Sequence, residues 1–256
     1  MDWNQVHAAI WRRYNRTLRP IRRLDSLRRG DLQGVERQWQ LLADNTQRFI
    51  AGEPSNNALL WGARGTGKSS LIKALLNEYA GQGLRIVEMD RDDLIHLPEV
   101  VDELENEPFR FIVYCDDLAF SAGESGYRAL KSALEGSLEM PPENVKIYAT
   151  SNRRHLLPER MADNVASKMV EDELHPAEAI EEQVSLADRF GLQLSFYPFS
   201  QDRYLEAVDA LYPQANDRHR LHILAVRFAT ERGVRNGRTA AQFYRANGGS
   251  DPSTDS

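Results

Sequence analysis

Hydrophobic positions follow two different periods along the chain, and the change from one to the other predicts the fold. Short apolar runs typical of buried strands occupy residues 57–61, 84–89, 109–118, 145–150 and 192–196. Apolar residues at helical spacing occupy residues 39–50, 70–79, 93–103, 124–139, 201–211, 218–232 and 239–246. Strands that alternate with helices form a parallel sheet with helices on both faces. The sequence therefore predicts an α/β fold with a three-layer αβα core, followed by a small domain made only of helices.

The same pattern divides the chain into four segments. Residues 1–30 are rich in arginine and are expected to be helical, and residues 31–198 are expected to form the α/β domain. Residues 199–246 form the predicted helical lid. Residues 247–256, NGGSDPSTDS, are polar and rich in turn formers, so they are predicted to be disordered.

The stretch between the first strand and its helix carries the most specific signal. Residues 61–71 read WGARGTGKSSL and match the pattern G-x-x-x-x-G-K-[ST] at every fixed position. Glycines let a loop of backbone N–H groups wrap phosphates, and the lysine brings a positive charge to the β- and γ-phosphates. The expected contacts with ATP are made by Gly62, Ala63, Arg64, Gly65, Thr66, Gly67, Lys68, Ser69 and Ser70. The fold is therefore predicted to be that of a P-loop NTPase.

Polar side chains at two later strand ends fit the chemistry of ATP hydrolysis. Residues 109–118 read FRFIVYCDDL, a buried strand that ends in Asp116 and Asp117. Asp116 is expected to hold Mg²⁺ together with the Ser69 hydroxyl, and Asp117 fits the position of a general base for the attacking water. Asn152 follows the strand 145–150, where a polar side chain can touch the γ-phosphate and orient the water.

Composition restricts the expected cellular location of the protein but does not identify a partner. The 256 residues carry a net charge of −6, and Cys115 is the one cysteine, so no disulfide framework is expected. No apolar run approaches 18 residues and no signal peptide opens the chain, so a cytoplasmic protein without membrane contact is expected.

Eight arginines between residues 12 and 29 stand out in this acidic chain. One interpretation is a basic arm that binds nucleic acid, an acidic partner or a neighbouring subunit. The other is a helix that packs on the core and turns a solvated basic face outward. Because the protein as a whole is acidic and no recognition motif accompanies the arginines, the second interpretation is favoured.

Over residues 30–246 the chain resembles the AAA+ ATPase superfamily. Residues 62–69 look like the Walker A loop, and residues 111–117 look like Walker B. The remaining resemblances are single positions, namely Asn152 as sensor 1, Arg189 in LADRFG as the arginine finger, Arg238 as sensor 2, and Gly34 with Val35 as the lining of the adenine pocket. Arg235 competes with Arg238, and Arg153, Arg154 and Arg160 are further candidates for contacts between subunits.

More narrowly, NNALLWGARGTGKSSLIKAL, CDDL, ALKSALEG and IYATSNRRHLLPE resemble a bacterial family of predicted AAA+-type ATPases, a domain of unknown function. Two departures from the superfamily stand out. Walker B usually ends in Asp-Glu, whereas here it ends in Asp116-Asp117, so the second carboxylate is one methylene shorter. No aromatic-glycine pore loop lies between the second strand and Walker B, which argues against an unfoldase that threads polypeptide.

The resemblance implies a Mg²⁺-dependent ATPase that converts ATP to ADP and phosphate. It also implies a homo-oligomeric ring in which Arg189 reaches a neighbour's site, and a protein or nucleic-acid substrate that the sequence does not identify. The alternative is an ATP-dependent switch or scaffold that hydrolyses slowly, as the shorter Asp117 would allow. A small-molecule kinase or a GTPase is disfavoured, because TSNR stands where a guanine-reading N-K-x-D would be expected.

Overall fold

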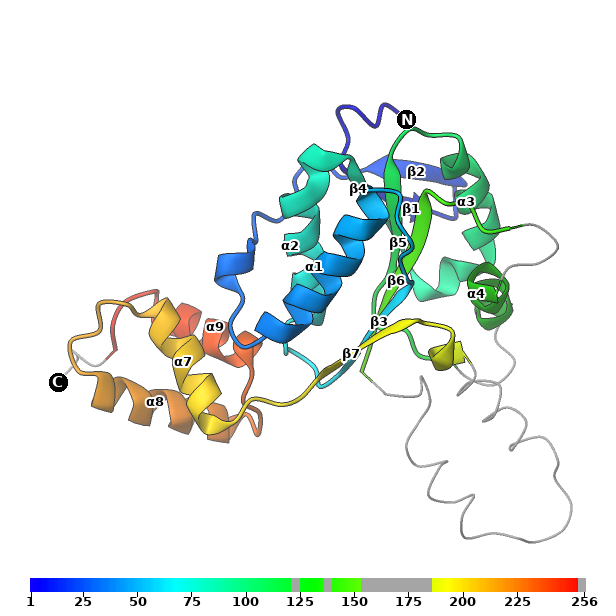
Figure 1. Cartoon of the computed structure of the whole chain (residues 1–256). Helices are drawn as coiled ribbons and strands as arrows, with labels where there is room; N and C mark the ends of the chain where they lie inside the picture. Colours follow the sequence, from blue (N-terminus) through cyan, green and yellow to red (C-terminus); the bar gives the residue numbers. More distant parts are fainter. Residues whose placement is uncertain (121–124, 136–139, 153–185, 253–256) are drawn as a thin grey trace, which may run out of the picture.

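The structure is a computed structural model that describes residues 1–120, 125–135, 140–152 and 186–252. Within these residues, seven strands form one sheet in the order β2-β1-β4-β5-β6-β3-β7 (Figure 1). The strands are β1 (Ala8–Arg12), β2 (Thr17–Pro20), β3 (Ala58–Gly62), β4 (Leu84–Met89), β5 (Arg110–Cys115), β6 (Val145–Ser151) and β7 (Leu192–Phe196). Every neighbouring pair is parallel except β1 with β2. The carboxyl ends of the parallel strands therefore share one edge of the sheet.

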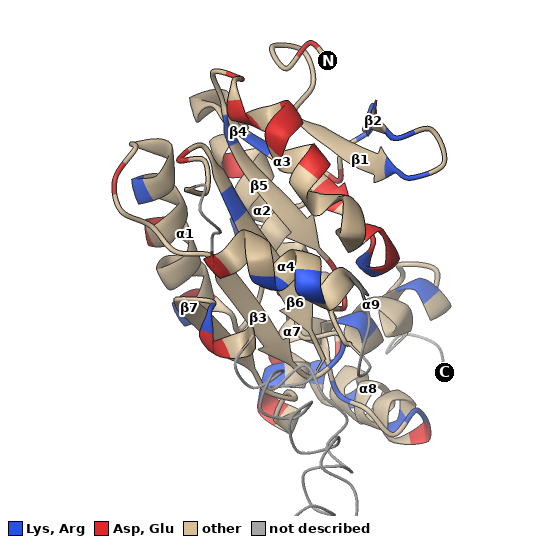
Figure 2. Ribbon diagram, turned by 90° about the vertical axis from the view of Figure 1, so that its right-hand side faces the viewer, with Lys and Arg blue, Asp and Glu red and all other residues tan. Residues whose placement is uncertain are grey.

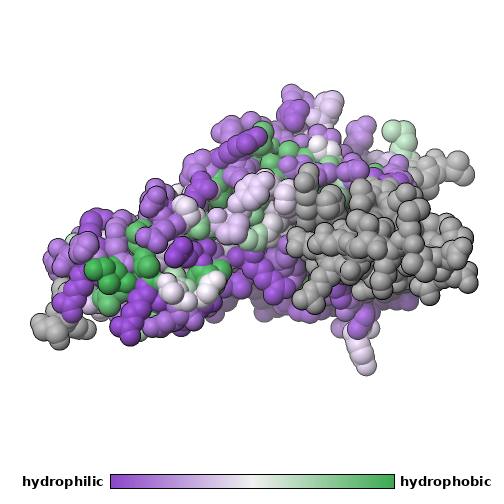
Figure 3. Space-filling view, turned by 90° about the horizontal axis from the view of Figure 1, so that it is seen from below, coloured by the Kyte–Doolittle hydropathy of each residue, from purple (hydrophilic) through white to green (hydrophobic). Residues whose placement is uncertain are grey.

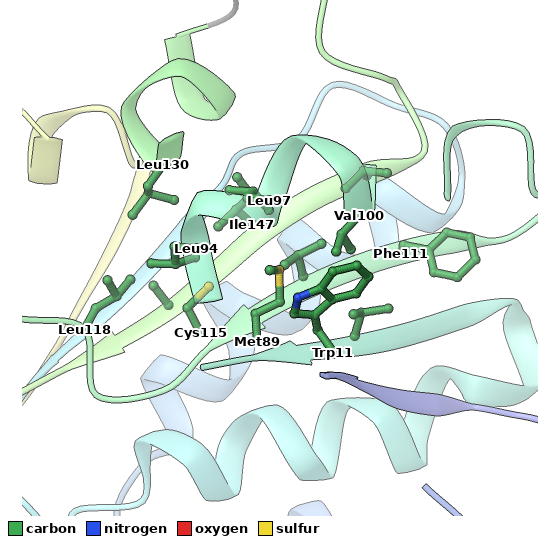
Figure 4. Close-up of a cluster of buried hydrophobic side chains, with 14 of the residues drawn as sticks. Trp11, Met89, Leu94, Leu97, Val100, Phe111, Cys115, Leu118, Leu130 and Ile147 are labelled. Atoms are coloured by element: carbon green, nitrogen blue, oxygen red, sulfur yellow. The ribbon is translucent and has the colours of Figure 1, made fainter. Parts of the chain in front are cut away.

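Helices cover both faces of this sheet. Helices α1 (Glu36–Ile50) and α2 (Lys68–Tyr79) lie on one face, and α3 (Leu97–Glu105) and α4 (Ser125–Glu135) lie on the other (Figure 1). Three short 3-10 helices are η1 (Arg29–Asp31), η2 (Ala80–Gln82) and η3 (Arg91–His96). Because successive strand residues point to opposite faces, Leu60 and Ile86 join the core under α1 and α2, whereas Leu59 and Val87 join the core under α3 and α4. Figure 4 shows the second of these cores.

Three further helices, α7 (Gln201–Leu211), α8 (Arg218–Glu231) and α9 (Gly237–Ala246), form a helical region beside the sheet (Figure 1). We refer to this region, which corresponds to the predicted lid, as the lid. They have a small core of their own, in which Tyr204 and Leu221 are fully buried. Aromatic contacts hold the three helices together, with the Phe228 and Phe243 ring centroids 5.4 Å apart. Each helix begins at a residue whose side chain accepts a backbone N–H, namely Ser200, Asp217 and Asn236.

The predicted αβα core with a helical region after it is confirmed. Strands β4 and β7 and helix α7 have the bounds that the apolar pattern predicts. The stretch between residues 156 and 180 lies outside the described residues, as do Arg153, Arg154 and Arg160. No helix in the described part of the chain is long and apolar enough to cross a membrane.

The prediction of a helix in residues 1–30 is wrong, because β1 and β2 form a hairpin there. Strand β1 pairs in parallel with β4, so the strand conformation depends on a partner far away in the sequence. Pro20 ends β2, the edge strand, where a residue without an N–H is tolerated. Local periodicity in runs of five and four residues was too short to reveal either strand.

The predicted disorder of the tail is also wrong for its first part. Residues 247–252 are described, and their backbone is held in turns that follow α9. The Asn216 N–H donates to Asp251 Oδ2 at 2.8 Å, which joins this segment to the loop before α8. The polar composition of the segment therefore serves hydrogen bonds to the lid. Residues 253–256 lie outside the described residues.

Candidate nucleotide-binding site

The loop between β3 and α2 has a conformation that requires glycine. Gly62, Gly65 and Gly67 have φ angles of 131°, 75° and 100°, a region that residues with a Cβ rarely adopt. A Cβ on Gly62 would lie 2.0 Å from the Phe196 carbonyl oxygen of β7, so the position is also closed sterically. Helix α2 begins at Lys68, directly after the loop. Its N-terminal N–H groups therefore face the loop interior, which favours an anion there.

The Lys68 ammonium lies across this loop. Its Nζ donates to the carbonyls of Gly62 and Ala63, both at 2.8 Å, and to Asn152 Oδ1 at 3.2 Å. Burial lowers the pKa of Lys68, and the Asp117 and Asp116 carboxylates oppose this shift only in part. A cation that is partly desolvated in this way binds phosphate oxygens more strongly than one in water.

Three hydroxyl groups converge on one oxygen of Asp116. Ser69 Oγ donates to Asp116 Oδ1 at 2.9 Å, Tyr114 OH donates to it at 2.7 Å, and Thr150 Oγ1 also donates to it. Burial raises the pKa of Asp116, but the hydroxyls of Thr150, Tyr114 and Ser69 outweigh it, so the pKa lies below its ordinary value. The carboxylate is thus charged at neutral pH.

Ser69 and Asp116 are the residues that could hold a divalent cation here. One hydroxyl and one carboxylate oxygen, 2.9 Å apart, are hard ligands of the kind that Mg²⁺ takes. The described residues contain no group of three or more His, Cys, Asp or Glu that could hold a metal. A protein site with so few ligands fits Mg²⁺, which is usually bound through one or two protein groups, substrate phosphates and waters.

Asp117 lies at the same strand end in an unusual backbone conformation. Its φ is 52°, and its N–H donates to Thr150 Oγ1 at 2.9 Å. Its carboxylate accepts a hydrogen bond from Asn152 Nδ2 and lies 3.7 Å from Arg64 Nη2. Asn152 therefore joins two charged groups, since its oxygen binds Lys68 and its amide nitrogen binds Asp117.

These residues line one cleft of about 1040 Å³ between the sheet and the lid. The phosphate-binding loop, Asp116, Asp117 and Asn152 form its polar end. Its less polar lining comes from the segment before α1 and from the lid, and includes Leu27, Leu32, Val35, Phe199, Ala207, Leu211, Ala240 and Ala241. Figure 3 shows hydrophobic residues gathered on the lid, at the left of the view. A ligand with an apolar ring at one end and negative charge at the other fits this cleft.

The predicted site residues are distributed unevenly around the cleft. Residues 64–70, Val35, Asp116, Asp117, Asn152 and Arg238 all line it, whereas Arg235 is not part of the lining. Gly34 is not part of it either, and a Cβ there would lie 2.4 Å from Arg203 Nε. Arg189 forms an ion pair with Glu135 on α4 and does not line the cleft. The roles assigned to these residues remain predictions.

Several residues in and around the site were not predicted from the sequence. Tyr114 and Thr150 support Asp116, and Glu88 at the end of β4 lines the same cleft. Tyr114 and Thr150 each stand two positions before a predicted site residue, so the period of a strand places them on the same face. The sequence therefore indicated the face on which each residue lies, but not the contact of Thr150 with Asp116, which depends on the register of β5 with β6. Burial and the Asp116 carboxylate raise the pKa of Glu88.

Asn236, also missed, connects the lid to the phosphate-binding loop. Its Nδ2 donates to the Arg64 carbonyl at 2.9 Å, and its Oδ1 accepts the Thr239 N–H at 2.8 Å as the N-cap of α9. One side chain therefore both begins the helix that carries Arg238 and holds that helix against the loop. A cap residue three positions before Thr239 was the sequence signal for the helix start, but nothing in the sequence reveals the second contact.

Replacing Asn236 with aspartate should separate these two roles. Aspartate is an equally good N-cap, so α9 should remain, but it cannot donate to the Arg64 carbonyl and adds a negative charge beside the phosphate site. We expect the free energy of unfolding to fall by about 1–3 kcal/mol and ATP to bind at least tenfold more weakly, as measured by calorimetric titration. Asn236→Ser keeps a cap residue without adding charge. Its ATP affinity should therefore lie between that of Asn236→Asp and that of the unchanged protein. Equal ATP affinity in Asn236→Asp and the unchanged protein would contradict the assigned contact.

Comparison with known structures shows which folds this one resembles. The fold is similar to that of the Orc1 protein of Aeropyrum pernix, solved in complex with DNA, with a TM-score of 0.59 and 16% identity over 85% of this chain. This chain spans 60% of that one. The RuvB Holliday junction branch migration motor of Thermotoga maritima matches 90% of this chain and 74% of its own, with a TM-score of 0.47 and 11% identity.

The sheet, its helices and the glycine loop define the fold as that of a P-loop NTPase. No curated protein matches the sequence. Residues 4–251 match the family described as "Protein of unknown function (DUF815)", and the chain belongs to that family. The prediction that the chain belongs to a family of unknown function is thereby confirmed.

Proposed function

We propose that the chain is a Mg²⁺-dependent ATPase that works as an oligomer to remodel a macromolecule. The observation that carries this proposal is the single hydrogen-bonded network at the polar end of the cleft. In it, Lys68 is joined through Asn152 to Asp117, and Ser69 is joined to Asp116. Thr150 connects the two parts, because its hydroxyl accepts the Asp117 N–H and donates to Asp116. These groups supply the positive charge, the metal ligands and the carboxylate base that phosphoryl transfer to water requires.

In the proposed mechanism, ATP lies with its base against the less polar part of the cleft and its triphosphate in the loop. Lys68 and the backbone N–H groups at the start of α2 bind the phosphate oxygens. Ser69 and Asp116 would hold Mg²⁺, which would supply positive charge beside the phosphates. Asp117 takes a proton from the water that attacks the γ-phosphorus, while Asn152 orients that water and the bond to the β-phosphate breaks. Arg238 on α9 faces the cleft and would sense the γ-phosphate from the lid.

Arg189 is proposed to act in a neighbour's site. Its guanidinium is paired with Glu135 within the same chain. On assembly, Arg189 would therefore have to leave Glu135 and bind the phosphate of ATP in the neighbouring subunit. Such fingers raise turnover by about 10³–10⁵ in well-studied nucleotide hydrolases. An isolated subunit is therefore expected to be nearly inactive.

Turnover against protein concentration tests this proposal. Phosphate release per subunit should rise with concentration, and Arg189→Ala should lower the plateau by at least about a hundredfold. Arg48→Ala, an exposed arginine on α1, is the matched control and should leave turnover unchanged. Specific activity that is high and independent of concentration would contradict the shared site. Thermal melting of each variant excludes unfolding as the cause.

One observation favours a second function, a switch that binds ATP and hydrolyses it slowly. The Asp117 carboxylate already accepts a hydrogen bond from Asn152 and lies near Arg64, so it is less free to act as a base. The same measurement separates the two functions. Tight ATP binding with very low turnover at every concentration, in the unchanged protein and in Arg189→Ala alike, would support the switch.

A further inference from the structure

The β1–β2 hairpin and the residues directly after it carry an unusual density of positive charge. Six exposed arginines lie within twelve positions, namely Arg12, Arg13, Arg16, Arg19, Arg22 and Arg23. We refer to residues 12–23 as the basic hairpin. Within the described residues only Arg13 has an ion-pair partner, Asp93 at 3.7 Å. Figure 2 shows these basic segments projecting at the edge of the sheet.

Strand alternation explains why the charge gathers on one side. Trp11 and Leu18 are paired across the hairpin and are buried in the core under α3, where the Trp11 ring lies 5.9 Å from that of His96. Arg12 and Arg19 point the other way, toward solvent, because they follow the opposite phase of the strand. The buried side thus holds the hairpin rigidly on the sheet, and the outer side presents the guanidinium groups.

An aromatic side chain occupies the turn of the hairpin. Tyr14 is 98% exposed, and it is the one exposed large hydrophobic side chain within residues 12–23. Arg16 closes the turn with a φ of 46°, a conformation that a long side chain rarely adopts. In a chain whose net charge is −6, an exposed ring among six exposed arginines needs an explanation other than solubility.

We propose that the basic hairpin binds single-stranded nucleic acid. Guanidinium groups match phosphate geometry with paired N–H donors, and a protruding ring stacks on an unpaired base without regard to sequence. A lipid surface would require more exposed apolar area than one tyrosine supplies. An acidic protein would satisfy the arginines but gives no role to the exposed ring. Acidic residues on η3 and α3 lie close by (Figure 2), yet among the described residues they form a direct ion pair with Arg13 alone.

The basic hairpin is also connected to the nucleotide cleft through residues 21–33. Lys73 Nζ on α2 binds Asp25 at 3.0 Å, and Asn77 Nδ2 donates to the carbonyls of Asp25 and Leu27, both at 2.7 Å. Leu27, Leu32 and Gln33 then line the cleft itself. One continuous segment, tied along α2, therefore joins the proposed nucleic-acid surface to the proposed ATP site.

Fluorescence anisotropy with a labelled oligodeoxythymidylate of about 20 nucleotides tests the proposal on the full chain without ATP. Arg16→Ala/Arg19→Ala should flatten the slope of log affinity against log salt by about 1.4, since each phosphate contact with a single strand contributes about 0.7. The matched control is Arg37→Ala/Arg48→Ala, which removes the same charge from two exposed arginines of α1 and should leave the slope unchanged. Tyr14→Ala should weaken binding by about tenfold to a hundredfold with an unchanged slope.

Four results would overturn the assignment. The unchanged protein fails to bind the oligonucleotide at about 50 mM salt, where electrostatic binding is strong. The α1 control loses as much affinity as the hairpin variant. A duplex of the same length binds as well as the single strand, and Tyr14→Ala has no effect on either. Vesicles of phosphatidylserine bind while the oligonucleotide does not. Because the assay contains no ATP, none of these results bears on the proposed ATPase.

Discussion

Lys68→Met should abolish measurable ATP hydrolysis and weaken ATP binding. Methionine keeps the length of the side chain but removes the charge and its donors. Loss of a charge-assisted contact to phosphate should lower ATP affinity by about tenfold to a hundredfold, which corresponds to about 1.5–3 kcal/mol. Loss of charge stabilisation in the transition state should lower the turnover number by a further hundredfold to thousandfold or so. Calorimetric titration with ATP and a phosphate-release assay measure the two effects separately.

Lys73→Met is the matched control for this prediction. Lys73 lies on the same helix and lines the same cleft, but its ammonium binds Asp25 and no group of the phosphate-binding loop. We expect turnover to change by less than about threefold, as is usual for an exposed ion pair. If both lysine variants lose activity equally, the effect reflects general electrostatics of the cleft and not the position of Lys68. Retained ATP affinity in Lys68→Met would contradict the assignment of the loop.

Asp116→Asn should remove the dependence of ATP binding on Mg²⁺. Asparagine has nearly the same shape, and its oxygen can still accept from the surrounding hydroxyls, so the fold should be retained. The charge that a divalent cation requires is lost. We expect the unchanged protein to bind ATP more tightly with Mg²⁺ than with a chelator, and the variant to bind it equally weakly in both. Turnover should fall by at least about a hundredfold.

Thr150→Ala provides the comparison for Asp116→Asn. It removes one of the three hydroxyls that hold Asp116 Oδ1 and also the acceptor for the Asp117 N–H, but it keeps both carboxylates. Because hydroxyl donation lowers the pKa of Asp116, this variant should need a higher pH to reach full Mg²⁺-dependent binding. A variant Asp116→Asn that still responds fully to Mg²⁺ would place the cation elsewhere.

The sequence predicted the parts of the site that are formed by contiguous residues. Strand β3, its glycine loop and the start of α2 are contiguous, so spacing alone predicted them. The strand ends at Asp116 and Asn152 were predicted because parallel strands present their carboxyl ends at one edge. The position of Thr150 beside Asp116 depends on the pairing of two strands that are separate in the sequence. Thr150 lies there because the register of β5 with β6 pairs Cys115 with Ala149, and no periodicity in either strand fixes that register.

The two errors have the same physical origin. The hairpin of residues 8–20 is stabilised by its pairing with β4, and the order of residues 247–252 depends on contacts with the lid. In both segments tertiary contacts outweigh local propensity. Asn236 is the equivalent case within the site, since its contact with the Arg64 carbonyl exists only once the lid lies against the loop.

The attachment of residues 21–33 along α2 has a thermodynamic consequence. A ligand that moves this segment changes the wall of the cleft and therefore the affinity for whatever occupies it. Linkage requires the reverse effect to be of the same size, so the cleft ligand must alter affinity at the hairpin by the same factor. A coupling of about 1–3 kcal/mol would correspond to a factor of about 5–150 at each site. The segment would thus act as a mechanical link between the two sites, and its stiffness would depend on the two carbonyl contacts that Asn77 makes with it.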